Sequence, residues 1–327
     1  PMPDAIAVRN VTKTFGPKIA VKNLDLIVPE GAVYGFIGPN GAGKTTAIRM
    51  IMSILFPDEG ELRVLGHESA LDAKDRIGYL PEERGVYKKM KVGAFLKFMA
   101  HLKGLDGADV GKRVKSWLEK VGLADVEQKK CEELSKGMQQ KIQFISAVIH
   151  EPDLLILDEP FSGLDPVNMR LLRDLVLAEH RRGATVIFST HVMVQAEQIC
   201  DHIVMIHEGE TRLDDSLADV RRRGDPRTIP LDPLPETADD TPLRESDGVV
   251  DVRRENGAFE IALVEGSDPG DAIARIAAKV PASRIEVHRP TLEDIFVAIV
   301  QSELKDAEAA EQLRASVRAG ATTEAAR

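Results

Sequence analysis

The fold of this chain is decided by one stretch, Gly38-Pro39-Asn40-Gly41-Ala42-Gly43-Lys44-Thr45-Thr46. It fits the pattern G-x-x-x-x-G-K-[ST], which is typical of a loop that cradles phosphate groups. The apolar run Val33–Ile37 before it predicts a buried strand, and the residues from Thr45 to Leu55 after it are apolar at helical spacing. A strand, a glycine-rich loop and a helix in this order predict a nucleotide-binding site and make a chance glycine turn a poor alternative.

Each type of residue in this loop suits a polyphosphate. The glycines allow the backbone to approach the phosphates closely, and the N-terminus of the following helix directs its free N–H groups at the anion. We expect Lys44 to reach the β- and γ-phosphates and the hydroxyl of Thr45 to bind Mg²⁺. The residues expected to bind the nucleotide here are Gly38, Pro39, Asn40, Gly41, Ala42, Gly43, Lys44, Thr45 and Thr46.

A second apolar strand ends in two carboxylates. The run Asp153–Leu157 is followed directly by Asp158 and Glu159, and its continuous hydrophobicity is typical of a parallel strand that is covered on both faces. In such sheets, ligands bind at the carboxyl ends of the strands. We expect Asp158 to anchor Mg²⁺ through its water shell and Glu159 to polarise the attacking water. The alternative is a pair of acids that only cap the next turn.

Two further residues are candidates because of where predicted strands end. The β-branched run Ala184–Thr190 ends at His191, which we expect to contact the γ-phosphate, although a lone histidine is more often structural. Phe15 lies at the turn between two predicted N-terminal strands, residues 5–8 and 19–28. Its ring either stacks on an adenine base or belongs to the core of a small N-terminal sheet, and composition favours neither.

The region between the phosphate loop and the acidic strand indicates a helical insertion. Apolar residues recur at helical intervals from Val92 to Val148. We therefore expect an α/β domain over residues 1–223, with a helical subdomain at about 84–150. One face of the first predicted helix carries Phe95, Phe98, Met99 and Leu102.

A change of composition predicts a second, smaller domain over residues 224–303. Prolines cluster near its start and indicate a linker or an irregular edge, with a first strand at Thr228–Leu231. Further on, the chain has a hairpin signal at Asn256-Gly257, a helix start at Asp268-Pro269 and a capping box at Thr291-x-x-Asp294. These signals predict a small α+β, ferredoxin-like unit.

Length, composition and charge limit the classes of function. The chain of 327 residues has 43% hydrophobic residues and a formal net charge of −10, which argues against a broad nucleic-acid surface. Two cysteines, Cys131 and Cys200, form no disulfide framework and suit a reducing cytoplasm. No apolar run approaches the length of a membrane span, so work at a membrane would need spanning helices from another polypeptide. The tail, 304–327, is expected to be helical or disordered.

Three more stretches indicate a family. Leu134-Ser135-Lys136-Gly137-Met138-Gln139-Gln140 resembles the signature motif of ABC ATPases and lies, as theirs does, between the phosphate loop and the acidic strand end. Ser162-Gly163-Leu164-Asp165 resembles their D-loop, and Ser189-Thr190-His191 resembles their switch histidine. The resemblance covers Ala5 to about Arg223, with the motifs in the family's order. It implies a P-loop NTPase (RecA-like) α/β core with an N-terminal antiparallel β subdomain and a helical insertion.

The resemblance adds residues to the candidate site. Ser135 and Gly137 match residues of the signature that contact phosphate, and Asp165 matches the aspartate of the D-loop. Glu82 stands where ABC ATPases usually have Gln, a residue that helps to bind Mg²⁺ and senses the membrane partner. A glutamate still accepts Mg²⁺ but adds a charge. The signature also departs from the usual pattern, since it has a single glycine where the family usually has two glycines followed by Gln.

The resemblance also implies partners and a location. In the family, the signature of one subunit closes over nucleotide held by the other, which implies a homodimer, or a heterodimer of ABC ATPases, with ATP at the interface. The segment Arg289-Pro290-Thr291-Leu292-Glu293-Asp294-Ile295-Phe296 looks like part of the appendage of bacterial ABC-2-type exporter ATPases, including the sodium- and drug-efflux group. The implied function is Mg²⁺-dependent ATP hydrolysis that powers transport through separate integral membrane permease subunits, at the cytoplasmic face of the membrane.

The alternative function is that of a soluble ABC ATPase acting on ribosomes or DNA. Ribosome-acting members usually carry two ATPase cassettes in one chain, and chromosome-acting members insert a long coiled coil. This acidic chain shows neither feature, so no nucleic-acid partner is expected. A third class, a P-loop kinase or GTPase, does not explain Leu134–Gln140 or His191.

Overall fold

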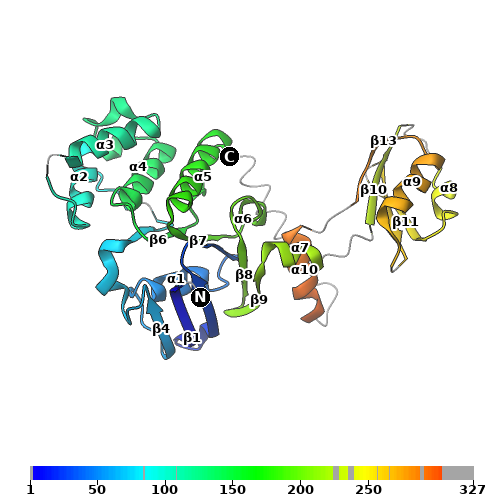
Figure 1. The fold of residues 1–327 in the computed structure, drawn as a ribbon, viewed down its shortest axis with the longest axis horizontal. Coiled ribbons are helices and arrows are strands. Elements are labelled where there is room, and N and C mark those ends of the chain that lie inside the picture. Colours follow the sequence, from blue (N-terminus) through cyan, green and yellow to red (C-terminus); the bar gives the residue numbers. More distant parts are fainter. Residues whose placement is uncertain are drawn as a thin grey trace. The chain divides into compact units, whose positions relative to one another are not determined.

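The computed structural model describes residues 3–83, 85–107, 109–223, 228–234, 239–255, 257–264, 266–287 and 291–303. The chain divides into two compact units, the first running to Leu217 and the second from Ala218 to Ala298. Figure 1 shows both, coloured along the sequence. The expected tail, 304–327, and parts of the expected proline-rich linker lie outside the described residues.

A six-stranded sheet forms the centre of the first unit. In spatial order it consists of β5 (Ile77–Leu80), β6 (Leu154–Asp158), β7 (Thr185–Thr190), β3 (Val33–Ile37), β8 (His202–His207) and β9 (Glu210–Ser216). The strands from β5 to β8 are parallel to their neighbours, and only β9 is antiparallel. The carboxyl ends of β3, β5, β6 and β7 therefore lie along one edge, where ligands bind in parallel sheets.

Both faces of this sheet are covered, as its continuous apolar runs predict. Every residue of β3, β6 and β7 is buried. On one face Phe36 and Ile156 share a core with Ile48 of helix α1 (Lys44–Ile51). On the other face Gly35 approaches Cys200, which caps α6 (Met193–Ile199), so closely that a Cβ would lie 2.7 Å from its Sγ. Helix α5 (Pro166–Arg182) packs against β7.

The N-terminal sheet consists of β1 (Asp4–Phe15), β2 (Lys18–Pro29) and β4 (Glu59–Val64), all antiparallel, in the order β2-β1-β4. This antiparallel subdomain was expected, but β1 is a 12-residue strand that extends well beyond the predicted residues 5–8. Helix α1 is shorter than predicted and ends at Ile51 rather than Leu55. Ser53 has a φ of 55°, a left-handed conformation that does not continue a right-handed helix.

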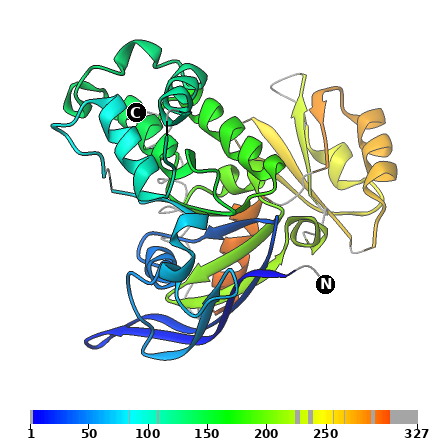
Figure 2. The same cartoon turned by 60° about the vertical axis from the view of Figure 1, so that its left-hand side comes forward.

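The helical insertion contains α2 (Val92–Leu102), α3 (Asp109–Lys120) and α4 (Lys136–Val148). Figures 1 and 2 show α2 and α3 at one end of the unit and the β1–β4 sheet at the other. The predicted apolar face of α2 is partly wrong, because Phe98 is 40% exposed and Leu102 is 55% exposed. The buried face of α2 includes Val92, Phe95, Leu96 and Ala100. Phe98 and Leu102 therefore lie outside that face.

The second unit contains a four-stranded antiparallel sheet. Its strands are β10 (Thr228–Pro233), β11 (Val249–Glu255), β12 (Ala258–Leu263) and β13 (Ala282–Ile285), in the order β11-β12-β10-β13. Helix α8 (Thr241–Arg244) follows β10, and α9 (Pro269–Lys279) precedes β13. This order is the split βαβ arrangement of a ferredoxin-like unit, which confirms the prediction.

Local signals in the second unit act as expected. Asp268 caps α9 by accepting a hydrogen bond from the Asp271 N–H, and Thr291 and Asp294 bond reciprocally at the start of α10 (Leu292–Glu303). Asn256 of the predicted hairpin lies outside the described residues, but its flanks pair at Glu255 and Ala258.

The remaining helices are η1 (Ala70–Arg76), η2 (Ala124–Val126), η3 (Cys131–Glu133) and α7 (Leu217–Arg223). No helix within the described ranges is long and apolar enough to cross a membrane.

Candidate nucleotide site

The phosphate loop passes so close to neighbouring backbone that only glycine fits at two positions. Gly38 has a φ of +151°, and a Cβ on it would lie 2.1 Å from the carbonyl oxygen of Ile206 in β8. Gly43 has a φ of +112°, and its Cβ would lie 2.4 Å from the carbonyl oxygen of Ala20 in β2. The loop is therefore held between the central sheet and the N-terminal sheet, and it delivers the N-terminus of α1 to the sheet edge.

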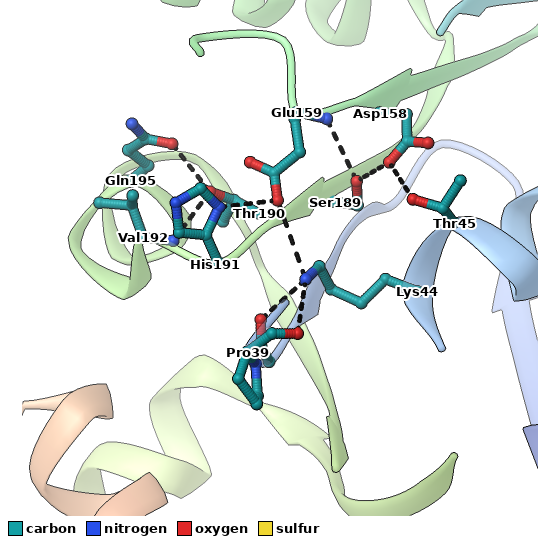
Figure 3. A network of polar contacts seen from close by, with 11 residues as sticks. Pro39, Lys44, Thr45, Asp158, Glu159, Ser189, Thr190, His191, Val192 and Gln195 are labelled. Atoms are coloured by element: carbon teal, nitrogen blue, oxygen red, sulfur yellow. Dashed lines mark hydrogen bonds and ion pairs between the residues drawn. The ribbon is translucent and has the colours of Figure 1, made fainter. Parts of the chain in front are cut away.

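Lys44 begins α1 and is the cation at the centre of the site (Figure 3). Its Nζ donates to the carbonyl oxygens of Gly38 at 2.8 Å and Pro39 at 3.2 Å, and it lies 3.8 Å from Oε1 of Glu159. Burial lowers the pKa of Lys44, while the carboxylates of Glu159, Asp158 and Glu82 oppose that shift. The ammonium is thus buried, positioned by the loop and surrounded by negative charge.

Asp158 ends β6 and is buried beside the first turn of α1. Its Oδ1 accepts hydrogen bonds from the hydroxyls of Ser189, on the adjacent strand β7, and of Thr45, the latter at 3.3 Å. Its Oδ2 is buried and has no hydrogen-bond partner among the described residues. Burial raises the pKa of this carboxyl, and the Ser189 and Thr45 hydrogen bonds partly offset that. One acceptor oxygen therefore remains available next to the Thr45 hydroxyl.

Glu159 follows the strand in an unusual backbone conformation. Its φ is +48°, and its N–H donates to Oγ and to the carbonyl oxygen of Ser189, each at 3.2 Å. A non-glycine residue in this region is strained and persists only where its surroundings hold it. With this backbone conformation the carboxylate faces His191, whose Nδ1 lies 3.0 Å from Oε1, and Lys44. The predicted alternative, acids that only cap a turn, does not describe this arrangement.

A pocket of about 340 Å³ opens at this edge, large enough for part of a nucleotide. Phe15 is one of its walls and is 47% exposed, so the alternative of a core aromatic is wrong. Lys18 and Ala20, which the sequence analysis did not single out, also line it. The pocket is lined by Phe15, Lys18, Ala20, Asn40, Gly41, Ala42, Gly43, Lys44, Thr45, Thr46, Glu82 and Glu159.

Glu82 reaches the pocket from the end of β5. Burial and the nearby carboxylates of Asp158 and Glu159 raise its pKa, and Lys44 opposes this. Glu82 forms no ion pair within the part of the chain that the structure describes. Three carboxylates thus share one buried lysine, an excess of negative charge that favours a bound cation.

Other predicted site residues lie apart from this cluster. Ser135 caps α4 and accepts from the Met138 N–H at 3.3 Å, and Asp165 caps α5 by accepting from the N–H groups of Val167 and Asn168. Neither of them, nor Gly137, lines the pocket. They form the exposed N-termini of two helices.

Two polar partners behind the cluster had no assigned role in the sequence. Ser189 bonds to Asp158 and to the Glu159 N–H, and Gln195 accepts from the Thr190 hydroxyl at 2.9 Å, as Figure 3 shows. Thr190 Oγ1 in turn accepts from the Val192 N–H at 3.0 Å. These bonds fix the end of β7 on both sides of His191. A hydroxyl two residues before His191, at the end of a predicted strand, was the available signal for Ser189.

Comparisons with known proteins identify the family. A sequence model of the ABC transporter family matches residues 21–162, and a model of the C-terminal domain of DrrA1-3-like ATP-binding proteins matches residues 216–300. YhaQ of Bacillus subtilis, an uncharacterized ABC transporter ATP-binding protein, is 39% identical over 293 residues, which cover 89% of this chain and 97% of YhaQ. The Nod factor export ATP-binding protein I of Cupriavidus metallidurans is 32% identical over 311 residues, covering 92% of this chain and 99% of that protein.

A solved structure agrees with these relatives. An ATP-binding subunit of an ABC transporter superposes with a TM-score of 0.62 and 29% identity, covering 67% of this chain and 92% of that one. This chain therefore belongs to the family of ABC transporter ATP-binding proteins and has the ATPase domain of that family.

Proposed function

We propose that this chain hydrolyses ATP as a dimeric subunit of an ABC-2-type exporter and drives a separate membrane permease from the cytoplasmic face of the membrane. One observation carries the proposal: Lys44, Asp158, Glu159 and His191 form a connected, largely buried network at the sheet edge that the phosphate loop enters. The similarity to an export ATP-binding protein over 92% of this chain supports the transport role.

In this proposal the nucleotide lies along the pocket with its base against Phe15. The ring is exposed at one side of the pocket, where an adenine can stack on it. The polyphosphate follows the backbone from Asn40 to Thr46 and meets the N-terminus of α1. Lys44 then donates to the phosphates and offsets their charge where hydrolysis takes place.

The residues at the site fit a magnesium ion. Asp158 Oδ2, the buried oxygen without a partner among the described residues, suits a water of the ion's shell, and the Thr45 hydroxyl lies beside the same carboxylate. No group of three acidic, histidine or cysteine side chains in the described segments forms a ready metal cage. Mg²⁺ typically needs only one or two protein ligands because phosphate and water complete its shell. When bound, it would withdraw charge from the phosphates. Glu82 is proposed to contribute at the open side.

Glu159 is the proposed general base. Its carboxylate accepts a proton from a water molecule as the water oxygen forms a bond to the γ-phosphorus. The bond between that phosphorus and the bridging oxygen breaks, so ADP and inorganic phosphate leave and Glu159 holds the proton. His191, 3.0 Å from Oε1, orients the carboxylate and is proposed to donate to the γ-phosphate from its other nitrogen.

The exposed helix N-termini at Ser135 and Asp165 support the dimer. Gly137 has no positive φ, and a Cβ on it would lie 3.6 Å from Leu164 and 3.7 Å from Asn168, which is ordinary contact. Nothing within the described chain therefore requires glycine at this position. A phosphate approaching from a second subunit would require it, because a bare helix N-terminus allows close approach to an anion.

The proposal is tested with Glu159→Gln in the full chain. The amide keeps the size of the side chain but accepts no proton, so turnover should fall about 10²–10⁴-fold while ATP still binds. Gel filtration with ATP and Mg²⁺ should show a dimer that the wild type does not accumulate, and phosphate release should be lost. Glu179→Gln is the matched control, since Glu179 is a buried glutamate paired with Arg182 on α5.

Two results would contradict the proposal. Near-normal phosphate release by Glu159→Gln would remove Glu159 from the role of base. A variant that binds ATP and stays monomeric at all concentrations would contradict the shared site. The role in export is tested separately, by identifying the integral membrane protein that co-purifies with the wild-type chain.

A further inference from the structure

The carboxylate of Asp58 binds residues near the end of strand β1. Asp58, in the loop between α1 and β4, accepts hydrogen bonds from the Thr14 N–H, from the Thr14 hydroxyl and from Lys13 Nζ, each at 2.7 Å. Its own N–H donates to the carbonyl oxygen of Thr12 at 2.9 Å. The hydrogen bond from Lys13 has the largest effect on the pKa of Asp58, and together with those from Thr14 it lowers that pKa to about 2. Asp58 thus contacts three successive residues of β1.

This part of β1 has an irregular strand ladder. The register between β1 and β2 shifts between Val11 and Lys13 and again between Lys13 and Thr14. On the other side, pairing with β4 ends at Thr12, which lies opposite Glu59. Pairing with β2 resumes at Thr14, opposite Ile19, and at Phe15, opposite Lys18, so the irregular stretch lies directly before Phe15, where a bulge can redirect a side chain. The Asp58 carboxylate supplies hydrogen bonds where the ladder is irregular.

The next residue is Phe15, which forms one wall of the nucleotide pocket. Its ring is 47% exposed, so packing holds it on one side only. The Lys13 ammonium, held by Asp58, lies 5.7 Å from the centroid of this ring. Phe15 pairs with Lys18 of β2, and the residues that Asp58 binds hold the chain on its other side and place a lysine over its ring.

We propose that Asp58 is a positioning residue for the nucleotide base, which fixes the end of β1 so that Phe15 presents its ring to the pocket. The inference rests on the proposed function, in which the base stacks on Phe15. Helix α1 begins at Lys44, on the phosphates, and the loop that follows it carries Asp58. One continuous segment would therefore hold both ends of the nucleotide.

The test compares Asp58→Ala, Phe15→Ala and the double variant in the full chain. Stacking of a base on an aromatic ring is strong enough that partial loss should raise KM for ATP about fivefold, with kcat unchanged. Binding of magnesium tripolyphosphate, which has no base, should stay at the wild-type affinity by titration calorimetry. In the Phe15→Ala background, Asp58→Ala should cause no further change, because the two residues act on one contact.

Asp153→Ala is the control, since it removes another aspartate ion pair at the surface, with Arg76, at the amino end of β6. It should leave KM unchanged. Asp58→Asn can still accept a hydrogen bond from the Thr14 N–H but forms no ion pair with Lys13. It should raise KM for ATP by less than Asp58→Ala, and it serves as the test if the alanine variant does not fold.

Three results would overturn the inference: a wild-type KM in Asp58→Ala, an equal loss of tripolyphosphate affinity, or effects of Asp58 and Phe15 that multiply in the double variant. Failure of the proposed function is a different observation. In that case the wild type itself would bind tripolyphosphate and ATP equally, or would bind neither.

Discussion

Two regions of the first unit carry predicted nucleotide contacts, and they are held in opposite ways. At the sheet edge, Lys44, Asp158 and Glu159 are buried and bonded to one another or to adjacent strand ends. At the N-termini of α4 and α5, Ser135 and Asp165 are exposed, and among the described residues their side chains bond only to their own helices. The first region is complete within one chain. The second region consists of two helix N-termini that are proposed to meet a nucleotide held by a second subunit, and neither Ser135 nor Asp165 lines the pocket described above.

The difference has a physical cause. A buried carboxylate or ammonium is stable only when partners compensate for lost water, so the sheet edge must satisfy its charges internally. A helix N-terminus at the surface is satisfied by water and by its cap, so it can exist without a partner. Mutations should therefore affect the two regions differently.

The largest expected effect in the exposed region is that of Gly137→Glu. The new carboxylate would occupy the second position of α4, where a negative charge suits the helix, so thermal stability should not fall. It would repel a phosphate brought by a second subunit, and turnover should fall about 100-fold or more. ATP binding to the isolated chain should be unchanged, since Gly137 does not line the pocket.

Gly111→Glu is the matched control for this change. Gly111 is also a helical glycine, in α3, and the nearest atom to a Cβ there is Lys97 Cε at 3.9 Å. Normal phosphate release in Gly111→Glu with loss in Gly137→Glu would support the comparison. Full activity in Gly137→Glu would show that α4 has no role at the phosphate.

Lys44→Ala changes the buried region and should impair ATP binding, the step that precedes hydrolysis. It removes a charged hydrogen bond to phosphate, worth roughly 1.5–3 kcal/mol, so ATP affinity should fall tenfold or more. The loss also leaves Glu159 and Asp158 without their buried cation. Titration calorimetry with ATP measures the effect directly.

Lys103→Ala provides a close control, because Lys103 Nζ also donates to two carbonyl oxygens, those of Lys74 and Ile77. Burial lowers the pKa of Lys103 as it does that of Lys44. Equal ATP affinity for wild type and Lys44→Ala would contradict the assignment of the phosphate loop. An equal loss in both lysine variants would indicate a general effect on folding.

Glu82 should show the smallest effect, because its side chain is exposed at the open side of the pocket. If it contributes to the magnesium site, Glu82→Ala should shift the Mg²⁺ dependence of ATP hydrolysis by about threefold, the size of a partly screened charge interaction. Glu82→Gln keeps an oxygen ligand and should be tolerated. Glu83→Ala is the neighbouring control, as Glu83 does not line the pocket. Superimposable curves for all variants would exclude a role at the metal.

Local sequence alone determined many of the strands, turns and helix starts of this protein. The loop from Gly38 to Thr46 specifies a strand, a turn and a helix start, since its glycines and its lysine each suit a single local conformation and chemistry. The continuous apolar run of β3 predicted a buried strand, and that of β6 predicted a parallel strand, because only a strand covered on both faces needs no polar side. The helix caps at Asp268 and Thr291 could also be predicted from the sequence, because each cap involves residues within four positions of one another.

Only the tertiary structure decided which distant residues meet and which side chains face water. Sequence patterns left Phe15 open between core and pocket, and placed Phe98 and Leu102 on the packed face of α2, because local periodicity does not record what lies opposite. The bonds from Ser189 to Asp158 and from Thr14 to Asp58 join residues 31 and 44 positions apart. Such contacts follow from strand order and from the path of loops, which depend on the packing of the whole sheet rather than on any one segment.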